Sequence, residues 1–378
     1  MDEISFYFLF DGNFPELSYL EFKCLISGIS HLSYNTLNFS NEVLSIQVTG
    51  SYLEIIKTFQ KYSRLVSLTK EIGLFYFSIE YKSKDQFESI QEKLLSILNK
   101  KPTKYKIPSK STFRVEMIKR GIINEDLFNS TNRQHLVFNI ADALIDNYDL
   151  KVDLKNEDIL IIVFLTPNRI IFGQRLFKPN RKLIMSRTPS SRPYFHSGSM
   201  NPLLIRAMIN LALQNKYFPM NKNINFKNIF LDPFMGAGGI LMEAGTMGYE
   251  TIGIELGYWM TRGARMNLSD LANSGYNSSF WTIIRSDSNA IPLKSNCVDI
   301  IVTDPPYGHS TILGGQKLED LLHNVIIECY RVLKKGSRMV ISIPSHVKTS
   351  FNNFVILAEI TDRVHNSLTR IIYLLEKQ

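Results

Sequence analysis

The sequence predicts an α/β fold in which a doubly wound parallel sheet occupies the second half of the chain, after smaller α+β modules. From about residue 200, short apolar runs alternate with helical stretches, as in β–α units with parallel strands. The first 200 residues instead combine amphipathic helices with strands rich in aromatic residues. At 378 residues the chain is also too long for one ordinary core, so we expect two or three domains.

The first two modules are predicted from alternating periodicities. Strand-like runs are ISFYFLF, EVLSIQVTG and LFYFSIEY, and the helical runs between and after them are FPELSYLEFKCLISGI, YLEIIKTFQKYS and KDQFESIQEKLLSILNK. The middle of the chain continues with strand TFRVEMIKRG, helix LVFNIADALIDNYDL, and strands DILIIVFLT and RIIFGQRLF. Strands with a helix between them indicate a compact α+β module.

The second half begins with the helical stretch NPLLIRAMINLALQN. The strands expected after it lie in NIFLDPFMGAGG, TIGIEL, WTIIRSD, DIIVTDPPYG and SRMVISIP. The terminal EITDRVHNSLTRIIYLLEK is expected to form two strands that close the edge of the sheet.

The composition is that of a soluble globular protein, with 44% hydrophobic and 21% charged residues. The longest apolar run, ILIIVFL, is much shorter than a membrane helix requires, and the acidic N-terminus MDEIS lacks the basic start of a signal peptide. The three widely spaced cysteines fit neither a disulfide framework nor a metal site. We therefore expect a cytoplasmic protein with no membrane partner and no metal.

Two stretches concentrate the net charge of +8. Residues 99–120 hold a single acid, Glu116, and residues 177–192 hold none. Cations interleaved with Phe and Tyr suit a nucleic-acid backbone, but solvated linkers carry the same charge, so composition leaves both interpretations open. The candidate RNA-binding residues are Lys101, Lys104, Lys106, Arg114, Lys119, Arg120, Lys178, Arg181, Lys182 and Arg187.

A glycine-rich turn follows an acidic strand end in IFLDPFMGAGGILMEA. Gly236 and Gly238 would let a ligand approach the backbone beside the start of a helix. A dinucleotide fingerprint counted from Gly236 would need glycine where Leu241 stands, which disfavours NAD(P) and FAD. Asp232 would repel a phosphate but would bind a cationic amino group, such as that of the methionine moiety of S-adenosylmethionine.

Two further acids follow the next two strands. Glu255 comes 23 residues after Asp232, a spacing that suits ribose hydroxyls, and Asp287 is placed to accept from an adenine amino group. Each acid alone would more often be a cap or turn former, but three at successive strand ends would meet in one crevice. The candidate cofactor-binding residues from these strand ends are Asp232, Pro233, Gly236, Gly238, Glu255, Leu256, Asp287 and Ser288.

The fourth strand ends in DPPYG, where two prolines disfavour both helix and sheet interior. Asp304 and the carbonyl of Pro305 would accept hydrogen bonds from a planar NH2 group, and Tyr307 would stack on its ring. We therefore predict Asp304, Pro305, Pro306 and Tyr307 as the catalytic motif of methyl transfer to an amine. The motif leaves adenine N6, cytosine N4, guanine N2 and glutamine amides open.

At this point the chain resembles a known family. RPYFHSGSMNPLLIRAMINLA, DPFMGAGG, DPPYG and RVHNSLTRIIYLL are similar to the archaeal tRNA guanine-10 N2-methyltransferases and their eukaryotic relatives. The resemblance implies a ferredoxin-like domain at residues 1–65, a THUMP RNA-binding domain at 66–176, a basic linker at 177–195 and a Rossmann-like S-adenosylmethionine-dependent methyltransferase domain at 196–378. It also implies that His196, Ser197, Gly198, Ser199 and Met200 lie against the methionine end of the cofactor.

The resemblance implies tRNA as the substrate, and it leaves several alternatives open. These are another tRNA guanine such as one in the acceptor stem, a base in rRNA, and an RNA-binding protein with a vestigial methyltransferase domain. Mono- or dimethylation, a small zinc-binding activator subunit, and a monomer or weak dimer are all compatible with it. The family usually has Cys and Thr where this chain has Met235 and Ala237. Arg192, Arg262, Arg265, His365 and Arg370 lie in matching stretches without an assigned role.

Overall fold

The protein is described by a computed structural model over residues 2–27, 32–40, 42–82, 85–100, 107–213, 228–275, 281–307, 317–351, 353–365 and 368–378. The chain divides into two compact units. The first comprises Met1–Pro15, His31–Ser63 and Thr69–Pro179, and the second comprises Glu16–Ser30, Arg64–Leu68 and Asn180–Gln378.

The first unit contains one eight-stranded sheet in the order β2-β3-β1-β4-β8-β7-β5-β6. Its strands are β1 (Asp2–Phe10), β2 (Ser33–Ser40), β3 (Val43–Gly50), β4 (Thr69–Glu80), β5 (Thr112–Lys119), β6 (Lys151–Val152), β7 (Ile159–Leu165) and β8 (Arg169–Phe177). Its helices are α2 (Tyr52–Leu65, whose last two residues group with the second unit), α3 (Phe87–Asn99) and α4 (Ser130–Tyr148).

The first part of this sheet has the predicted ferredoxin-like topology. Strand β1 pairs antiparallel with both β3 and β4, and β2 pairs antiparallel with β3. The chain order is β1, α1, β2, β3, α2 and β4, which gives the spatial order β4-β1-β3-β2. The core is aromatic, as the sequence indicated, because Phe6 and Phe8 pack edge-to-face on Phe59 of α2.

The rest of the sheet belongs to a second α+β layer. The run ILIIVFL forms β7, where all seven residues are buried between β8 and β5. Helix α4 begins at a side-chain cap, since Asn129 accepts a hydrogen bond from the Asn132 amide at 2.9 Å. Strands from the predicted ferredoxin-like segment, residues 1–65, and from the predicted THUMP segment, residues 66–176, therefore belong to one sheet.

The second unit holds a seven-stranded sheet. Its strands are β9 (Ile229–Asp232), β10 (Glu250–Glu255), β11 (Trp281–Arg285), β12 (Val298–Thr303), β13 (Leu333–Pro344), β14 (Phe354–His365) and β15 (Leu368–Lys377). Its helices are α1 (Pro15–Ser27), α5 (Arg181–Met185), α6 (Pro202–Ala212), α7 (Gly239–Thr246), α8 (Tyr258–Asn273) and α9 (Leu318–Val332), with short 3-10 turns η1 (Pro189–Ser191) and η3 (Ser288–Ala290).

The sheet order, β11-β10-β9-β12-β13-β15-β14, confirms the predicted doubly wound fold. Strands β11, β10, β9, β12 and β13 pair in parallel, and the terminal β14–β15 hairpin closes the edge in antiparallel fashion, as expected. The chain reverses its direction of winding between β9 and β12. In such sheets a ligand binds at this point, outside the carboxyl ends of the strands.

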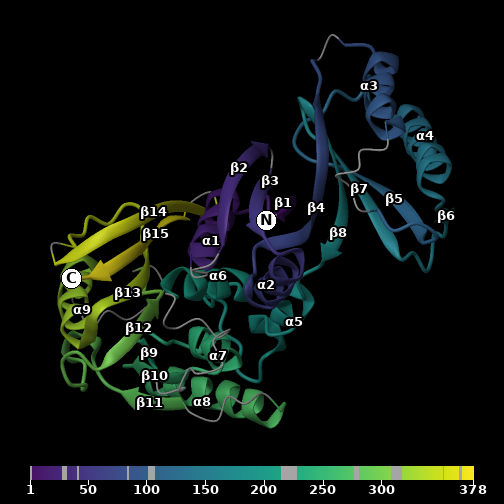
Figure 1. Ribbon diagram of the computed structural model, residues 1–378. Coiled ribbons are helices and arrows are strands. Elements are labelled where there is room, and N and C mark those ends of the chain that lie inside the picture. The colour runs from purple at the N-terminus through teal and green to yellow at the C-terminus, as the bar shows by residue number, and fades with distance from the viewer. Residues whose placement is uncertain are drawn as a thin grey trace. The chain divides into compact units, whose positions relative to one another are not determined.

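Helices cover both faces of this sheet (Figure 1). The apolar side of α9, including Leu322, Val325 and Cys329, packs on buried residues of β12 and β13. Helices α6, α7 and α8 lie on the other face, with α7 against β10 and α8 against β11. Helix α6 starts at a capping residue, because Asn201 accepts from the Leu203 amide at 2.8 Å and Pro202 follows at the first helical position.

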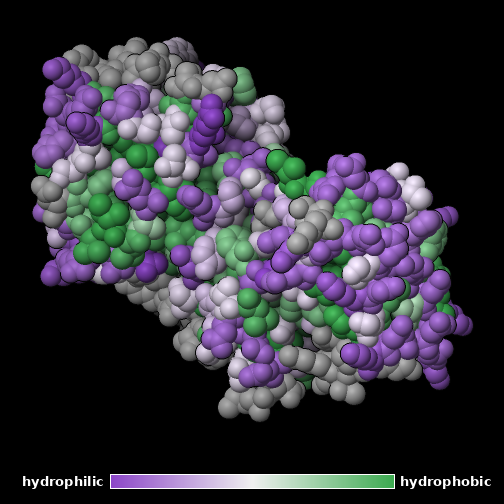
Figure 2. Space-filling view, turned by 90° about the horizontal axis from the view of Figure 1, so that it is seen from above, coloured by the Kyte–Doolittle hydropathy of each residue, from purple (hydrophilic) through white to green (hydrophobic). Residues whose placement is uncertain are grey.

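Polar side chains are spread widely over the face seen in Figure 2, with smaller hydrophobic groups among them. Among the helices of the described segments, none is long and apolar enough to cross a membrane.

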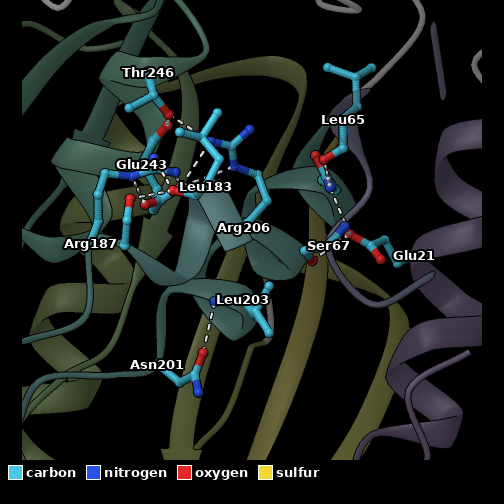
Figure 3. A network of polar contacts seen from close by, with 12 residues as sticks. Glu21, Leu65, Ser67, Leu183, Arg187, Asn201, Leu203, Arg206, Glu243 and Thr246 are labelled. Carbon is cyan, nitrogen blue, oxygen red and sulfur yellow. Dashed lines mark hydrogen bonds and ion pairs between the residues drawn. The ribbon is translucent and has the colours of Figure 1, made fainter. Parts of the chain in front are cut away.

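Helix α1 groups with the second unit through a buried carboxylate (Figure 3). Glu21 accepts hydrogen bonds from the Ser67 amide at 3.0 Å, from the Leu68 amide at 2.9 Å and from Asn210 Nδ2 of α6 at 2.7 Å. Asn210 also donates to the Leu65 carbonyl at 3.1 Å. These bonds satisfy an acid that is fully buried, so α1 and residues 64–68 are anchored to α6.

The predicted basic linker differs from a solvated connection. Within residues 177–195 the chain forms α5 and η1, and the side chains of Arg187 and Arg192 are buried in the second unit. For Arg187 the reason is a buried counter-charge, the Glu243 carboxylate of α7, described below. The remaining boundaries that the resemblance implied stay a prediction.

Candidate active site

The glycine turn after β9 is shaped by left-handed backbone and by packing on β10. Gly238 adopts φ +81° and donates to the Met235 carbonyl at 2.8 Å, which closes the turn before α7. Met235 donates to the Ile254 carbonyl at 3.0 Å, and its side chain lies over Gly253, where a Cβ would come within 2.4 Å of the sulfur. The departure from the family's usual Cys is thus accommodated by a glycine on the neighbouring strand.

Asp232, the last residue of β9, is fully buried with one oxygen unpaired. Its Oδ1 accepts from Thr303 Oγ1 at 2.8 Å and from the Phe234 amide at 3.0 Å, whereas Oδ2 has no hydrogen-bond partner among the described residues. Burial raises the pKa of Asp232 to about 7, against the effect of these two hydrogen bonds. The nearby carboxylates of Asp304 and Glu255 add to the increase. A buried carboxylate with a free oxygen suits a cationic ligand group.

The other strand-end acids lie along the same edge. Parallel register places Glu255 opposite Arg285, and Gly253 opposite Asp232. Glu255 accepts from the Gly257 amide at 2.8 Å, and Asp287 caps η3 by accepting from the Asn289 amide at 2.9 Å. Ser288 is buried and donates to the Pro233 carbonyl. The structure therefore places the predicted strand-end residues along one carboxyl edge of the sheet, with Leu256 exposed beside them.

Residues 196–200 form a turn ahead of α6. Ser199 donates to the His196 carbonyl at 3.1 Å, and the His196 ring lies over Gly198, where a Cβ would come within 3.0 Å of Cε1. Ser197 is exposed, whereas Met200 is buried. Contact of these residues with a cofactor stays a prediction.

Asn267 of α8 joins the segment before this turn to the glycine turn. Its Nδ2 donates to the Ala237 carbonyl at 2.9 Å and to the Tyr194 carbonyl at 3.1 Å, while its Oδ1 accepts from the Tyr194 amide at 2.9 Å. The Tyr194 ring fills the space above Gly263 of the same helix. Sequence reasoning missed Asn267, although an amide at a core-facing helix position is a usable signal.

The DPPY motif follows β12 and turns its tyrosine inward. The hydroxyl of Tyr307 donates to Asp304 Oδ1, and it lies 3.0 Å from Ser342 Oγ on β13. Arg370 of β15 donates to the same hydroxyl at 3.2 Å. The sequence did not predict these contacts of the Tyr307 hydroxyl. It predicted only that the Tyr307 ring stacks on a base, and that role stays a prediction.

An ion pair on the terminal hairpin supports the motif. Arg370 Nε donates to Asp362 Oδ2 of β14 at 2.8 Å, and both side chains are buried. Burial raises the pKa of Asp304, whereas the positive charge of Arg370 and the hydrogen bond from Tyr307 oppose the increase. Burial alone would lower the pKa of Arg370, but Tyr307, Asp304 and Asp362 together raise it. Arg370 therefore stays charged beside the DPPY motif. A lone arginine in the apolar run LTRIIYLL was the available sequence signal.

A buried network holds α5, α6 and α7 together behind the glycine turn (Figure 3). Glu243 of α7 accepts from Arg187 Nε at 2.6 Å and from an Arg187 terminal nitrogen at 2.9 Å. It also accepts from Arg206 of α6 at 2.8 Å, and Arg206 donates to Thr246 Oγ1 at 2.6 Å. Arg192 lies beside them, with Nε donating to the Arg187 carbonyl at 3.1 Å.

The network predicts a large loss of stability for Glu243→Gln. The substitution leaves two buried guanidinium groups without their counter-charge, so we expect the free energy of unfolding to fall by about 3–5 kcal/mol. Chemical denaturation followed by circular dichroism measures this. Glu125→Gln, which alters an exposed ion pair with Lys119, should leave the midpoint unchanged. A Glu243→Gln midpoint equal to the wild-type value would contradict the interpretation.

The structure places the predicted RNA-binding residues in different environments. Arg187 is corrected: it is buried against Glu243 and presents no free guanidinium. Arg114, Lys119 and Arg120 are near Glu157, Glu125 and Glu42 respectively, at 3.0, 2.7 and 3.6 Å, in partly exposed ion pairs. Lys178 and Lys182 are exposed, and Arg181 is half-buried. Lys101, Lys104 and Lys106 lie outside the described residues.

Comparison with known proteins agrees with this geometry. Residues 84–173 match the THUMP domain, and residues 189–371 match the RMKL-like methyltransferase domain. TrmN from Thermus thermophilus is similar in fold, with a TM-score of 0.54 and 18% identity over 99% of this chain and 100% of that one. The structure of SMU.472 complexed with SAH has a TM-score of 0.54 and 13% identity, over 100% of this chain and 99% of that one. The chain is a THUMP-containing methyltransferase.

Comparison with a sequence relative shows to which family of methyltransferases the chain belongs. The tRNA (guanine(10)-N2)-dimethyltransferase of Methanothermobacter thermautotrophicus is 34% identical over 241 residues, which is 63% of this chain and 67% of that protein. The chain belongs to the family of the tRNA (guanine(10)-N2)-dimethyltransferases. The resemblance found in the sequence motifs is thereby confirmed.

Proposed function

We propose that the protein transfers methyl groups from S-adenosylmethionine to the exocyclic N2 of guanine 10 in tRNA. The single observation that carries the proposal is that Asp232, Glu255, Asp287 and the DPPY motif follow parallel strands along one carboxyl edge of the sheet, which includes its switch point. The name of the relative, a tRNA (guanine(10)-N2)-dimethyltransferase, supports the choice of base and position.

The residues at the crevice fit S-adenosylmethionine. The unpaired Oδ2 of Asp232 suits the ammonium group of the methionine moiety, and Glu255 suits the ribose hydroxyls. Asp287, as a hydrogen-bond acceptor, and the exposed apolar Leu256 would suit the adenine. When bound, the cofactor supplies an electrophilic methyl group on a sulfonium.

The DPPY motif would prepare the amine for transfer. The N2 lone pair of guanine is conjugated into the ring, so acceptors on its N–H bonds favour the pyramidal nitrogen that can react. Asp304 supplies one acceptor through its carboxylate and Pro305 another through its carbonyl. The raised pKa of Asp304 also suits it to take the proton that the nitrogen loses. The remaining rate acceleration would come from holding the amine in line with the methyl group.

The experiment uses unmodified tRNA transcripts with guanine or adenine at position 10, labelled S-adenosylmethionine and identification of the product nucleosides. We expect N2-methylguanosine or N2,N2-dimethylguanosine with the first transcript and neither with the second. Methylguanosine in both would move the site to another guanine, such as one in the acceptor stem. No product from either, with tRNA and cofactor still bound, would favour an RNA-binding protein. Adding a small zinc-binding activator subunit tests whether one is required.

A further inference from the structure

The outward side of α8 carries an aromatic and cationic surface that the active site does not use. It consists of Tyr258, Trp259, Arg262 and Arg265 of α8 together with Arg285, the last residue of β11, and we call it the α8 surface. Tyr258, Arg262 and Arg265 stand at positions i, i+4 and i+7, so they form one stripe on the helix. All five residues are exposed, with 69% of the Trp259 side chain and 53% of Tyr258 open to solvent.

The aromatic rings and the arginines are arranged together. The Tyr258 and Trp259 rings meet edge-to-face, with centroids 5.1 Å apart. The Arg262 guanidinium lies 5.9 Å from the Trp259 ring centroid, and Arg285 lies 5.7 Å from that of Tyr258. Phe138 and Phe195 are exposed to a similar extent, so exposure alone does not set this surface apart. Its distinguishing feature is that two exposed aromatic rings contact each other and two guanidinium groups, which makes one continuous surface for a partner.

The charges identify the chemistry of that partner. Within the described part of the chain, none of the three arginines of the α8 surface forms an ion pair. The two acids of this region are engaged elsewhere, since Glu255 and Asp287 accept from backbone amides. Arg285 Nε does donate to the Leu256 carbonyl at 3.2 Å. Arginines without an acidic partner beside exposed aromatic rings suit a strand that offers phosphates and flat bases.

The position of the surface matches an RNA substrate. Tyr258 and Trp259 open α8 directly after β10, so they lie at the same carboxyl edge of the sheet as the DPPY motif that follows β12. We propose that the α8 surface binds the RNA substrate, with a base stacked on Trp259 and phosphates held by Arg262 and Arg265. This rests on the proposed function for the identity of the RNA, and it adds a contact made by the methyltransferase domain itself.

The chain permits a direct optical test, because Trp259 and Trp281 are its two tryptophans. In a Trp281→Phe variant the emission comes from Trp259 alone, and an unmodified tRNA transcript should quench it in a saturable titration. The matched Trp259→Phe variant, which reports from Trp281, should change much less. Quenching by S-adenosylmethionine alone would assign Trp259 to the cofactor pocket and overturn the proposal.

Substitution supplies the second measurement. Trp259→Ala should raise the Kd for tRNA by roughly 5- to 100-fold, and Arg262→Ala with Arg265→Ala should lower the slope of log K against log salt by about 1–2. Lys294 is an exposed cation a few residues before β12, so Lys294→Ala is the matched control. It should change neither the Kd for tRNA nor the salt slope. Cofactor affinity and thermal midpoint should stay at wild-type values in all variants, because these side chains are exposed.

The outcomes separate this proposal from the proposed reaction. If tRNA quenches Trp259 and the variants bind tRNA more weakly, but no methylated guanine forms, RNA binding by the α8 surface is supported and the proposed reaction is contradicted. Normal methylation with wild-type KM for tRNA in Trp259→Ala would overturn the α8 surface and leave the reaction standing. Unchanged RNA affinity in every variant would also overturn it and point to a protein partner.

Discussion

Asp304→Ala should reduce the rate of methyl transfer by about 10²- to 10⁴-fold while leaving S-adenosylmethionine binding intact. The carboxylate is placed after β12 at the switch point, and its hydrogen bond with Tyr307 fixes its orientation. Removing it takes away the acceptor for the amine proton, whereas the cofactor residues on β9 and β10 keep their positions. Single-turnover kinetics at saturating cofactor and tRNA measure the chemical step.

Two further variants separate alignment from proton transfer. Asp304→Asn retains an acceptor oxygen, so it should keep much more activity than Asp304→Ala if orientation of the amine dominates. Tyr307→Phe removes the hydroxyl contacts with Asp304, Ser342 and Arg370 but keeps the ring, and a smaller loss is expected. An Asp304→Asn enzyme as slow as Asp304→Ala would instead assign the main effect to the negative charge.

Asp232→Asn should weaken S-adenosylmethionine binding by roughly 10- to 100-fold, as expected for a lost charge-assisted hydrogen bond. In the wild-type protein this affinity should depend on pH. Because burial raises the pKa of Asp232 to about 7, the cofactor-free carboxyl is increasingly protonated below pH 7. Only the ionised form pairs with an ammonium group, so affinity should fall as the pH falls, approaching tenfold per pH unit.

Calorimetric titrations between pH 5.5 and 8.5 test both parts. The dependence on pH below 7 should be much weaker in Asp232→Asn than in the wild-type protein. Asp299→Asn is a matched control, because Asp299 is also buried but lies at the opposite end of β12, paired with Lys334 at 2.7 Å. It should leave cofactor affinity unchanged. A wild-type affinity that is flat across this range would show that Asp232 is already ionised in the free protein.

The titration of Asp232 should also affect the free energy of unfolding. A lower pH weakens cofactor binding, but it should stabilise the folded protein. The pKa of Asp232 in the folded protein lies above its ordinary value of 3.8, so the folded state binds more protons than the unfolded state between about pH 4 and 7. The contribution of Asp232 to stability is therefore present at low pH and is lost as the pH rises through 7. Ionised Asp232 in the folded protein is stabilised again when a cation binds it.

The sequence by itself determined the order of elements and the position of the catalytic edge. Strand-end residues Asp232, Glu255, Asp287 and Asp304 each follow an apolar run, and parallel strands bring such ends together whatever the details of packing. Apolar periodicity predicted the terminal hairpin β14–β15, and the family resemblance implied the ferredoxin-like arrangement of the first strands. Local periodicity encodes these features because it reflects which side of each element is buried.

Only the tertiary structure decided which polar residues act together. Arg187 was expected to bind RNA because it lies in a run of cations, yet a carboxylate 56 residues later on α7 buries it. For Tyr307 the sequence indicated only a stacking ring, and the fold adds contacts of its hydroxyl with Asp304 and with Ser342 and Arg370, which are distant in sequence. Such partners come from strands and helices that meet only after folding, so no local pattern marks them. A charge in a sequence therefore predicts a ligand only when the fold leaves it without an opposite charge, as it does within the described segments for Asp232 Oδ2 and for the arginines of the α8 surface.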